Sequence, residues 1–187
     1  MRALLAFLCL LVAAPLARGQ ALPLDSQGKV SFYEVVQADS LRAGTLYTHA
    51  KRWLTHHGYH LSTADSVAGR LVGTQALALY DRGYLTKKLH GKVRYQLTLE
   101  VKNGRYRLEF NDFVFDYYQE DHAYRLVPTG KTKPLEEPLA AGWQKLWQSH
   151  QHDTLVGINS LQAELKTAML AVPRASAAAP QARSAAW

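Results

Sequence analysis

The chain has 187 residues, a formal charge of +7 at pH 7, 48% hydrophobic residues and one cysteine. This length suffices for one domain with a full hydrophobic core, and the modest charge is typical of a soluble protein. A single thiol excludes an intrachain disulfide and any metal site built from several cysteines.

The first residues are typical of an export signal. Arg2 precedes an apolar stretch from Ala3 to Leu16, which is too short to span a bilayer comfortably. Small residues at Ala17 and Gly19 predict cleavage before Gln20, so that residues 1–19 form a signal peptide; an uncleaved anchor is the alternative. Cleavage removes two arginines, no acid and the only thiol, which lowers the formal charge from +7 to +5 and leaves no transmembrane segment.

We expect one domain over residues 20–172, exported to the periplasm or outside a bacterial cell. A core without disulfides is sufficient for this length. The tail over residues 173–187 is rich in Ala, Pro and Ser without an apolar period, and it is predicted to be disordered.

The N-terminal half predicts a strand, a helix and two more strands. The segment KVSFYEVVQ, residues 29–37, is a strand by its valines and aromatics. Asp39-Ser40 is expected to cap a helix that runs to about His57, before Gly58. Short strands are expected over 59–62 and 68–80. The helix has one apolar stripe: Leu46, Ala50, Trp53, Leu54 and His57.

Residues 93–117 predict a long β-hairpin with a defined register. Apolar residues alternate from Val93 to Val101, and Asn103-Gly104 predicts a two-residue type I′ turn. The apolar phase then slips by one residue, which predicts a β-bulge at Asn111-Asp112. The expected partners are Val101 with Tyr106, Leu99 with Leu108, Leu97 with Phe110, Tyr95 with Phe113 and Val93 with Phe115.

The C-terminal part predicts an edge strand at YRLVPT and two helices. The first helix carries Leu139, Trp143, Leu146 and Trp147 at helical spacing, which favours a core stripe over a ligand groove. The polar run from His150 to Asp153 predicts a break, and a last helix follows. The resulting order, β-α-β-β-β-β-α-α, predicts an α+β fold with a twisted antiparallel sheet and helices packed on one face.

Four segments together resemble a family of uncharacterised secreted bacterial proteins, mostly from Bacteroidetes. The segments are GKVSFYEVV, LYTHAKRWL, DSVAGRLVGT and YQLTLEVKNGRYRLEFNDF, and they span about residues 28–117. The family is a domain of unknown function with a fold like that of the TATA-box-binding protein (TBP-like). The resemblance implies this fold and an export route, and it implies no catalytic residue.

A basic run is the best candidate for a binding surface. The run is Lys87, Lys88, His90, Lys92 and Arg94, with Tyr80, Tyr84 and Tyr118 as possible aromatic contacts. Such a patch suits an anionic partner: a phosphorylated lipid head group, an acidic glycan or an acidic envelope protein. The simpler interpretation is a solvated loop whose lysines protect an edge strand from pairing.

Two histidine clusters are candidates for a metal site. They are His56, His57 and His60, and His150, His152 and Asp153. Joined across two helices they would suit zinc or copper, and surface histidines at helix ends are the simpler explanation. No Gly-x-Ser-x-Gly, Walker or His-Glu-x-x-His motif occurs.

The sequence thus predicts an exported, non-enzymatic binding or adaptor module without catalytic residues, cofactor or metal. The alternative is a metal-assisted hydrolase that uses the clustered histidines. Nucleic acid binding is disfavoured, because a protein that kinks the minor groove needs an apolar sheet face ringed by cations.

Overall fold

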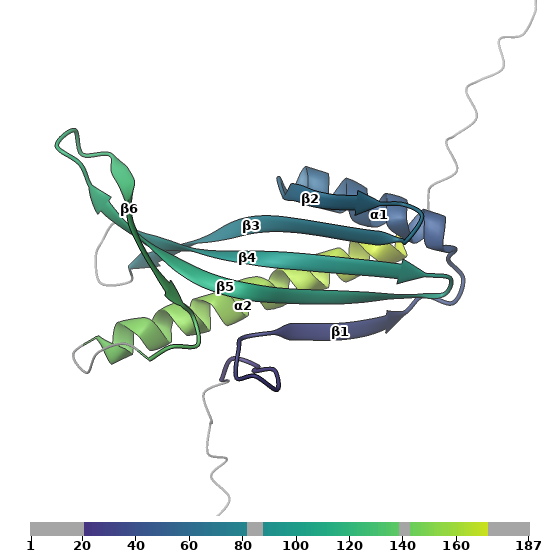
Figure 1. The fold of residues 1–187 in the computed structure, drawn as a ribbon, viewed down its shortest axis with the longest axis horizontal. Helices are drawn as coiled ribbons and strands as arrows, with labels where there is room; N and C mark the ends of the chain where they lie inside the picture. Colours follow the sequence, from purple (N-terminus) through teal and green to yellow (C-terminus); the bar gives the residue numbers. More distant parts are fainter. Residues whose placement is uncertain (1–20, 82–87, 139–142, 172–187) are drawn as a thin grey trace, which may run out of the picture.

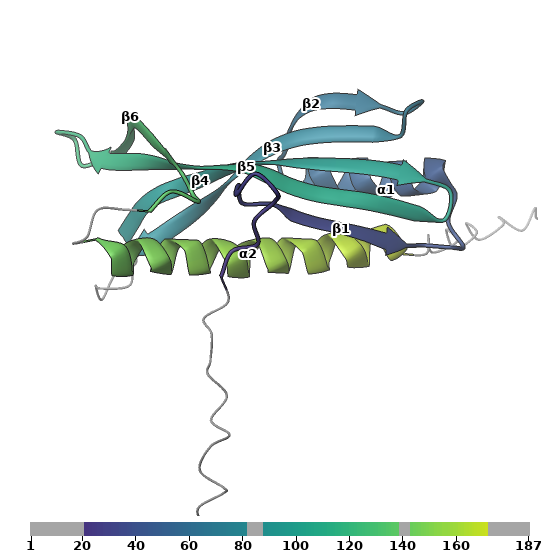
Figure 2. The same cartoon turned by 60° about the horizontal axis from the view of Figure 1, so that its bottom comes forward.

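The computed structural model describes residues 21–81, 88–138 and 143–171. The expected signal peptide and tail lie outside these residues. Six antiparallel strands form one sheet, and both helices pack on the same face of it (Figures 1 and 2), so the predicted α+β fold is confirmed. The elements are β1 (Phe32–Gln37), α1 (Ala43–His56), β2 (His60–Asp65), β3 (Arg70–Asp81), β4 (Lys88–Lys102), β5 (Arg105–Glu120), β6 (Leu126–Pro134) and α2 (Gln144–Leu170).

The sheet is organised around β5, its longest strand. The strand order is β1-β5-β4-β3-β2, and β6 also pairs with β5. Along the edge of β5 that faces away from β4, β1 pairs with residues 105–110 and β6 with residues 114–120. The expected edge strand at YRLVPT is therefore present, but it begins at Leu126, two residues later than predicted.

The register of the β4–β5 hairpin is the predicted one. Val101 pairs with Tyr106, and Val93 pairs with Phe115. The register shifts between Arg94 and Gln96, opposite Asp112, whose φ of 54° lies in the left-handed region. The predicted bulge is confirmed, and it keeps the aromatic residues on both sides of it facing the helices.

The turn of this hairpin also begins α1, which sequence reasoning missed. Only Gly104 has a positive φ, 74°, so the predicted type I′ geometry, which needs positive φ at both residues, is wrong at Asn103. The Asn103 Oδ1 atom instead accepts the Ala43 N–H at 2.8 Å. The predicted cap at Asp39-Ser40 is therefore wrong too: a side chain 60 residues away satisfies the first turn of α1.

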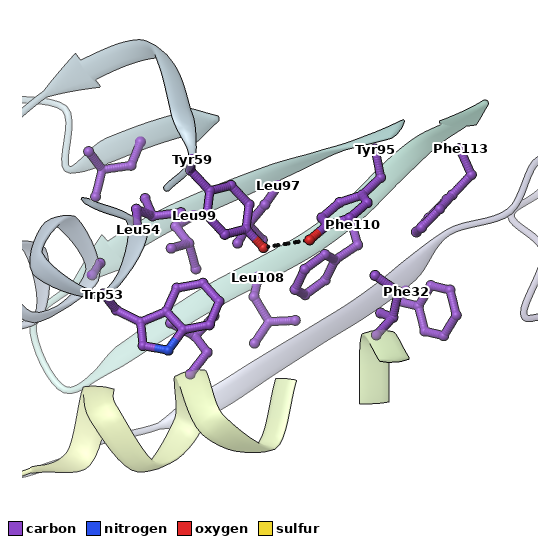
Figure 3. Packing of buried hydrophobic residues seen from close by; sticks show 14 of the residues in the cluster. Phe32, Trp53, Leu54, Tyr59, Tyr95, Leu97, Leu99, Leu108, Phe110 and Phe113 are labelled. Carbon is purple, nitrogen blue, oxygen red and sulfur yellow. Dashed lines mark hydrogen bonds between the residues drawn. The ribbon is translucent and has the colours of Figure 1, made fainter. Parts of the chain in front are cut away.

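One hydrophobic core fills the space between the sheet and the helices (Figure 3). The predicted stripe of α1 is confirmed, with Leu46, Ala50, Trp53 and Leu54 buried. The hydroxyl groups of Tyr59 and Tyr95 form a hydrogen bond of 3.0 Å inside this core, as Figure 3 shows. Pairing the two hydroxyls with each other satisfies polar groups that are otherwise costly to bury.

The C-terminal segment forms one continuous helix where a break was predicted. The polar run from His150 to Asp153 lies within α2, with His150 only 1% exposed. His150 does not interrupt the buried stripe, because the Nδ1 atom of His90 on β4 lies 2.6 Å from its Nε2 atom. Trp147 is buried as predicted, whereas Trp143 is 62% exposed and is not a core residue.

We expect Asn103→Ala to lower the free energy of unfolding by about 1 kcal/mol, because the Ala43 N–H loses its acceptor. Urea denaturation measures this loss. Asn159→Ala is the matched control: it removes an exposed amide within α2 and should have little effect. Equal effects of the two changes would contradict the capping role of Asn103.

We also expect alkaline unfolding governed by buried tyrosines. Burial raises the pKa of Tyr95 and of Tyr106 to about 12, and burial and the nearby Tyr95 raise the pKa of Tyr59. Their protonated forms favour the folded state, so their contribution to stability is complete below about pH 10 and is lost as the pH rises toward about 12. A titration of tyrosinate absorbance alongside circular dichroism measures both events.

The variant Tyr106→Phe tests this assignment. The Tyr106 hydroxyl is buried without a hydrogen-bond partner in the described part of the chain, so its removal should not destabilise the protein at neutral pH. It should also move the alkaline unfolding midpoint upward. Tyr124→Phe, at a side chain that is 87% exposed, should leave that midpoint unchanged, and a shift there would contradict the assignment.

Candidate binding surface

The open face of the sheet, opposite the helices, is the surface on which binding residues gather. Neither helix covers it, as Figure 2 shows for α2, which lies along the other face. Alternation places polar and charged side chains on it, with the exposed Tyr33 and Val35 from β1. Its central rows are Lys92, Arg94, Gln96, Thr98, Glu100 and Lys102 of β4, and Arg105, Arg107, Glu109 and Asp116 of β5.

The structure describes only part of the predicted basic run. Tyr84 and Lys87 lie outside the described residues, and only the backbone of Lys88 is described, as the partner of Asp81. Tyr80 is 45% exposed at the end of β3.

His90 is separated from the rest of the run. The register between β3 and β4 shifts beside it, since Leu79 pairs with Gly91 and Tyr80 pairs with Leu89. The ring of His90 therefore lies toward α2, stacked on His150 with centroids 4.8 Å apart. His90 belongs to the contact between sheet and helix, and not to the open face.

Lys92 and Arg94 lie on the open face, and a carboxylate there compensates part of their charge. The Arg94 guanidinium donates two hydrogen bonds to Asp116, at 2.5 and 2.9 Å, and this carboxylate raises the pKa of Arg94. The Lys92 Nζ atom lies 5.3 Å from the centre of the Tyr118 ring, a cation–π contact. Asp116 thus compensates the charge of Arg94, and the contact with Tyr118 leaves Lys92 with its own charge.

The opposite end of the same hairpin carries cations that sequence reasoning did not single out. Lys102 and Arg105 are direct register partners across the turn, and both are exposed. Beside them Arg107 binds Glu100 at 2.5 Å, and Glu100 raises the pKa of Arg107. The signal was present in the sequence, because the predicted register already set Lys102 opposite Arg105.

The two histidine clusters do not meet. His57 stacks on Trp53, and its Nε2 atom lies 3.3 Å from the Glu164 carboxylate of α2. His150 lies 14 residues before Glu164 on the same helix, about 21 Å away along the axis. In the described ranges no three His, Cys, Asp or Glu side chains are placed to hold a metal ion.

Comparison with known proteins identifies the central part of the chain. Residues 32–116 match the family described as a domain of unknown function (DUF4468) with TBP-like fold. This segment is similar to the DUF4468 family. The match runs from β1 into β5, close to the span of the resemblance seen in the sequence, which is confirmed.

Two solved structures share the fold of this chain. One is a TBP-like protein from Parabacteroides distasonis, with a TM-score of 0.63 and 15% identity over 80% of this chain and 97% of that one. The other is a DUF4468 family protein from Bacteroides ovatus, with a TM-score of 0.60 and 17% identity over 82% of this chain and 93% of that one. No curated protein matches the sequence. Neither helix in the described ranges combines the length and the apolarity needed to cross a membrane.

We expect the His90–His150 contact to couple β4 to α2 energetically. Replacing either histidine by alanine removes the same hydrogen bond and ring stack, so the double variant should lose less stability than the sum of the two single changes. Urea denaturation of the four proteins in a double-mutant cycle should give a coupling energy of about 1 kcal/mol. Strict additivity would contradict a direct interaction.

Proposed function

We propose that the protein is an exported, non-enzymatic binding module of the bacterial envelope, and that the open face of its sheet receives an anionic partner. One feature supports this proposal: both helices pack on one face, which leaves long strands with exposed charged and aromatic side chains on the other. Exposed tyrosines and arginines are the residue types that protein interfaces favour.

The charge of this face supports a localised anionic group over a long polyanion. Cations and carboxylates alternate on it, with Glu109 and Asp116 beside the basic residues. A minor-groove protein needs an apolar sheet face ringed by Arg and Lys, so the open face does not favour nucleic acid. The hydrolase alternative needs both histidine clusters at one site, and the separation along α2 argues against it.

Export is tested by expressing the full chain in a Gram-negative host. We expect the protein in the periplasmic fraction, with a mature N-terminus at Gln20 by mass spectrometry. An intact N-terminus in the cytoplasmic fraction would contradict this part of the proposal.

Binding is tested with tag-free protein that begins at Gln20. We expect retention on anionic lipid vesicles or an acidic glycan, and loss of retention at about 0.5 M salt, because ions screen exposed charges at that concentration. The variant Lys87→Glu/Lys88→Glu asks whether the basic run takes part, and Lys51→Glu/Arg52→Glu on α1 is its control with the same change in charge. No retention on either material at low salt would overturn the proposed anionic partner.

A further inference from the structure

The tip of the β4–β5 hairpin breaks the rule that the rest of this hairpin follows. On the open face β4 and β5 pair Glu100 with Arg107, and Arg94 binds Asp116, so opposite charges meet. Lys102 and Arg105 are instead two like charges directly opposite each other. Such a pair destabilises a sheet, and the fold itself gives no reason for it.

No carboxylate in the described part of the chain neutralises these two cations. Neither forms an ion pair there, and the nearest acid on the face, Glu100, is already held by Arg107 at 2.5 Å and lies 4.0 Å from the Arg70 Nε atom. Asp39 lies beside the turn, close to Gly104. Arg70 has Asp65 as its register partner on β2, and Arg107 is held by Glu100. The excess of positive charge at the tip therefore comes from Lys102 and Arg105, with which Asp39 forms no ion pair in the described residues.

Lys102 and Arg105, together with Glu100 and Arg107, line a shallow pocket of about 190 Å³. Pockets that enclose a small molecule have volumes of roughly 300–1,000 Å³, so this one has room for a single chemical group. Its apolar wall is Val35, 46% exposed, and the exposed Tyr33 lies beside it on β1. The lining residues are Val35, Glu100, Lys102, Arg105, Tyr106 and Arg107.

From these contacts we infer that the pocket at the hairpin tip, where Lys102, Arg105 and Arg107 surround Glu100, binds a phosphate monoester group. Guanidinium groups bind phosphate through paired hydrogen bonds, and an ammonium group adds a point charge. A phosphate monoester carries close to two negative charges at pH 7, which matches the excess at the tip. The inference rests on the proposed function and names the group that the open face recognises.

The experiment uses tag-free protein labelled with ¹⁵N and titrated with inorganic phosphate at constant ionic strength. We expect saturable shifts of the amide signals from Lys102 to Arg107. Acetate, which has one charge, should give much smaller shifts. Shifts that are absent, or spread over all exposed cations, would overturn the site.

The decisive variant is Lys102→Gln/Arg105→Gln, which removes both charges and their repulsion. We expect it to fold and to be at least as stable as the parent protein in urea, while its affinity for phosphate falls at least about tenfold. Lys51→Gln/Arg52→Gln removes the same charge from the exposed surface of α1 and should bind phosphate like the parent. Equal affinity of the parent and the tip variant would refute the proposal.

Vesicles then distinguish the source of the phosphate. Phosphatidylcholine vesicles that contain phosphatidic acid present a monoester, and those that contain phosphatidylglycerol present a diester. Retention on the first, lost in the tip variant, identifies a lipid carrier, whereas binding of inorganic phosphate alone identifies a soluble one. If phosphate binds at the tip but no anionic envelope material retains the protein, the site stands and the proposed envelope partner fails. If retention persists in the tip variant and phosphate causes no shifts at the tip, only the site fails.

Discussion

The register of β4 against β5 is the constraint on which the rest of the structure depends. All other strands join the sheet through this hairpin, directly or through β3. If β4 slipped by one residue, its apolar set would turn toward water, and each of these side chains is buried: Val93, Leu97, Leu99 and Val101. Burying such a side chain contributes about 1.5–3 kcal/mol, so four of them contribute about 6–12 kcal/mol, which is comparable with the whole stability of a typical domain, about 5–15 kcal/mol. The two helices can cover this face only because the register holds.

Sequence patterns predicted the parts of the fold that depend on neighbours in the chain. Alternation gave the hairpin, the slipped phase gave the bulge, and helical spacing gave the buried stripe of α1. The errors lie where a distant residue decides the outcome. The side chain of Asn103 accepts a hydrogen bond from the first turn of α1. His150 stays inside a helix because His90 pairs with it. Neither partner is visible from local pattern, since 60 residues separate each pair.

The candidate surface also combines features that follow from neighbours in the chain with features that depend on distant residues. The basic run is continuous in sequence, yet a register shift turns His90 toward α2, and Asp116, 22 residues from Arg94, neutralises that arginine. The number of cations in the basic run therefore overstated the positive potential at this end of the open face. At the turn the reverse holds: Lys102 and Arg105 lie three positions apart in a sequence that looks unremarkable, and pairing brings their charges together. What matters for an anion is the charge left after cross-strand pairing, and that follows from register.

The repulsion between Lys102 and Arg105 destabilises the fold only slightly. A cross-strand charge pair changes stability by roughly 0.2–1 kcal/mol, whether it attracts or repels. One repulsive pair at an exposed turn is thus a minor term beside the buried core, and the Asn103 cap and the backbone bond from the Gly104 N–H to the Leu41 carbonyl, 2.9 Å, hold the turn in place. Because these contacts come from the backbone and from Asn103, the side chains of Lys102 and Arg105 take no part in fixing the turn. Both side chains are therefore available to bind an anion. An anion placed between them attracts both cations and so offsets their mutual repulsion.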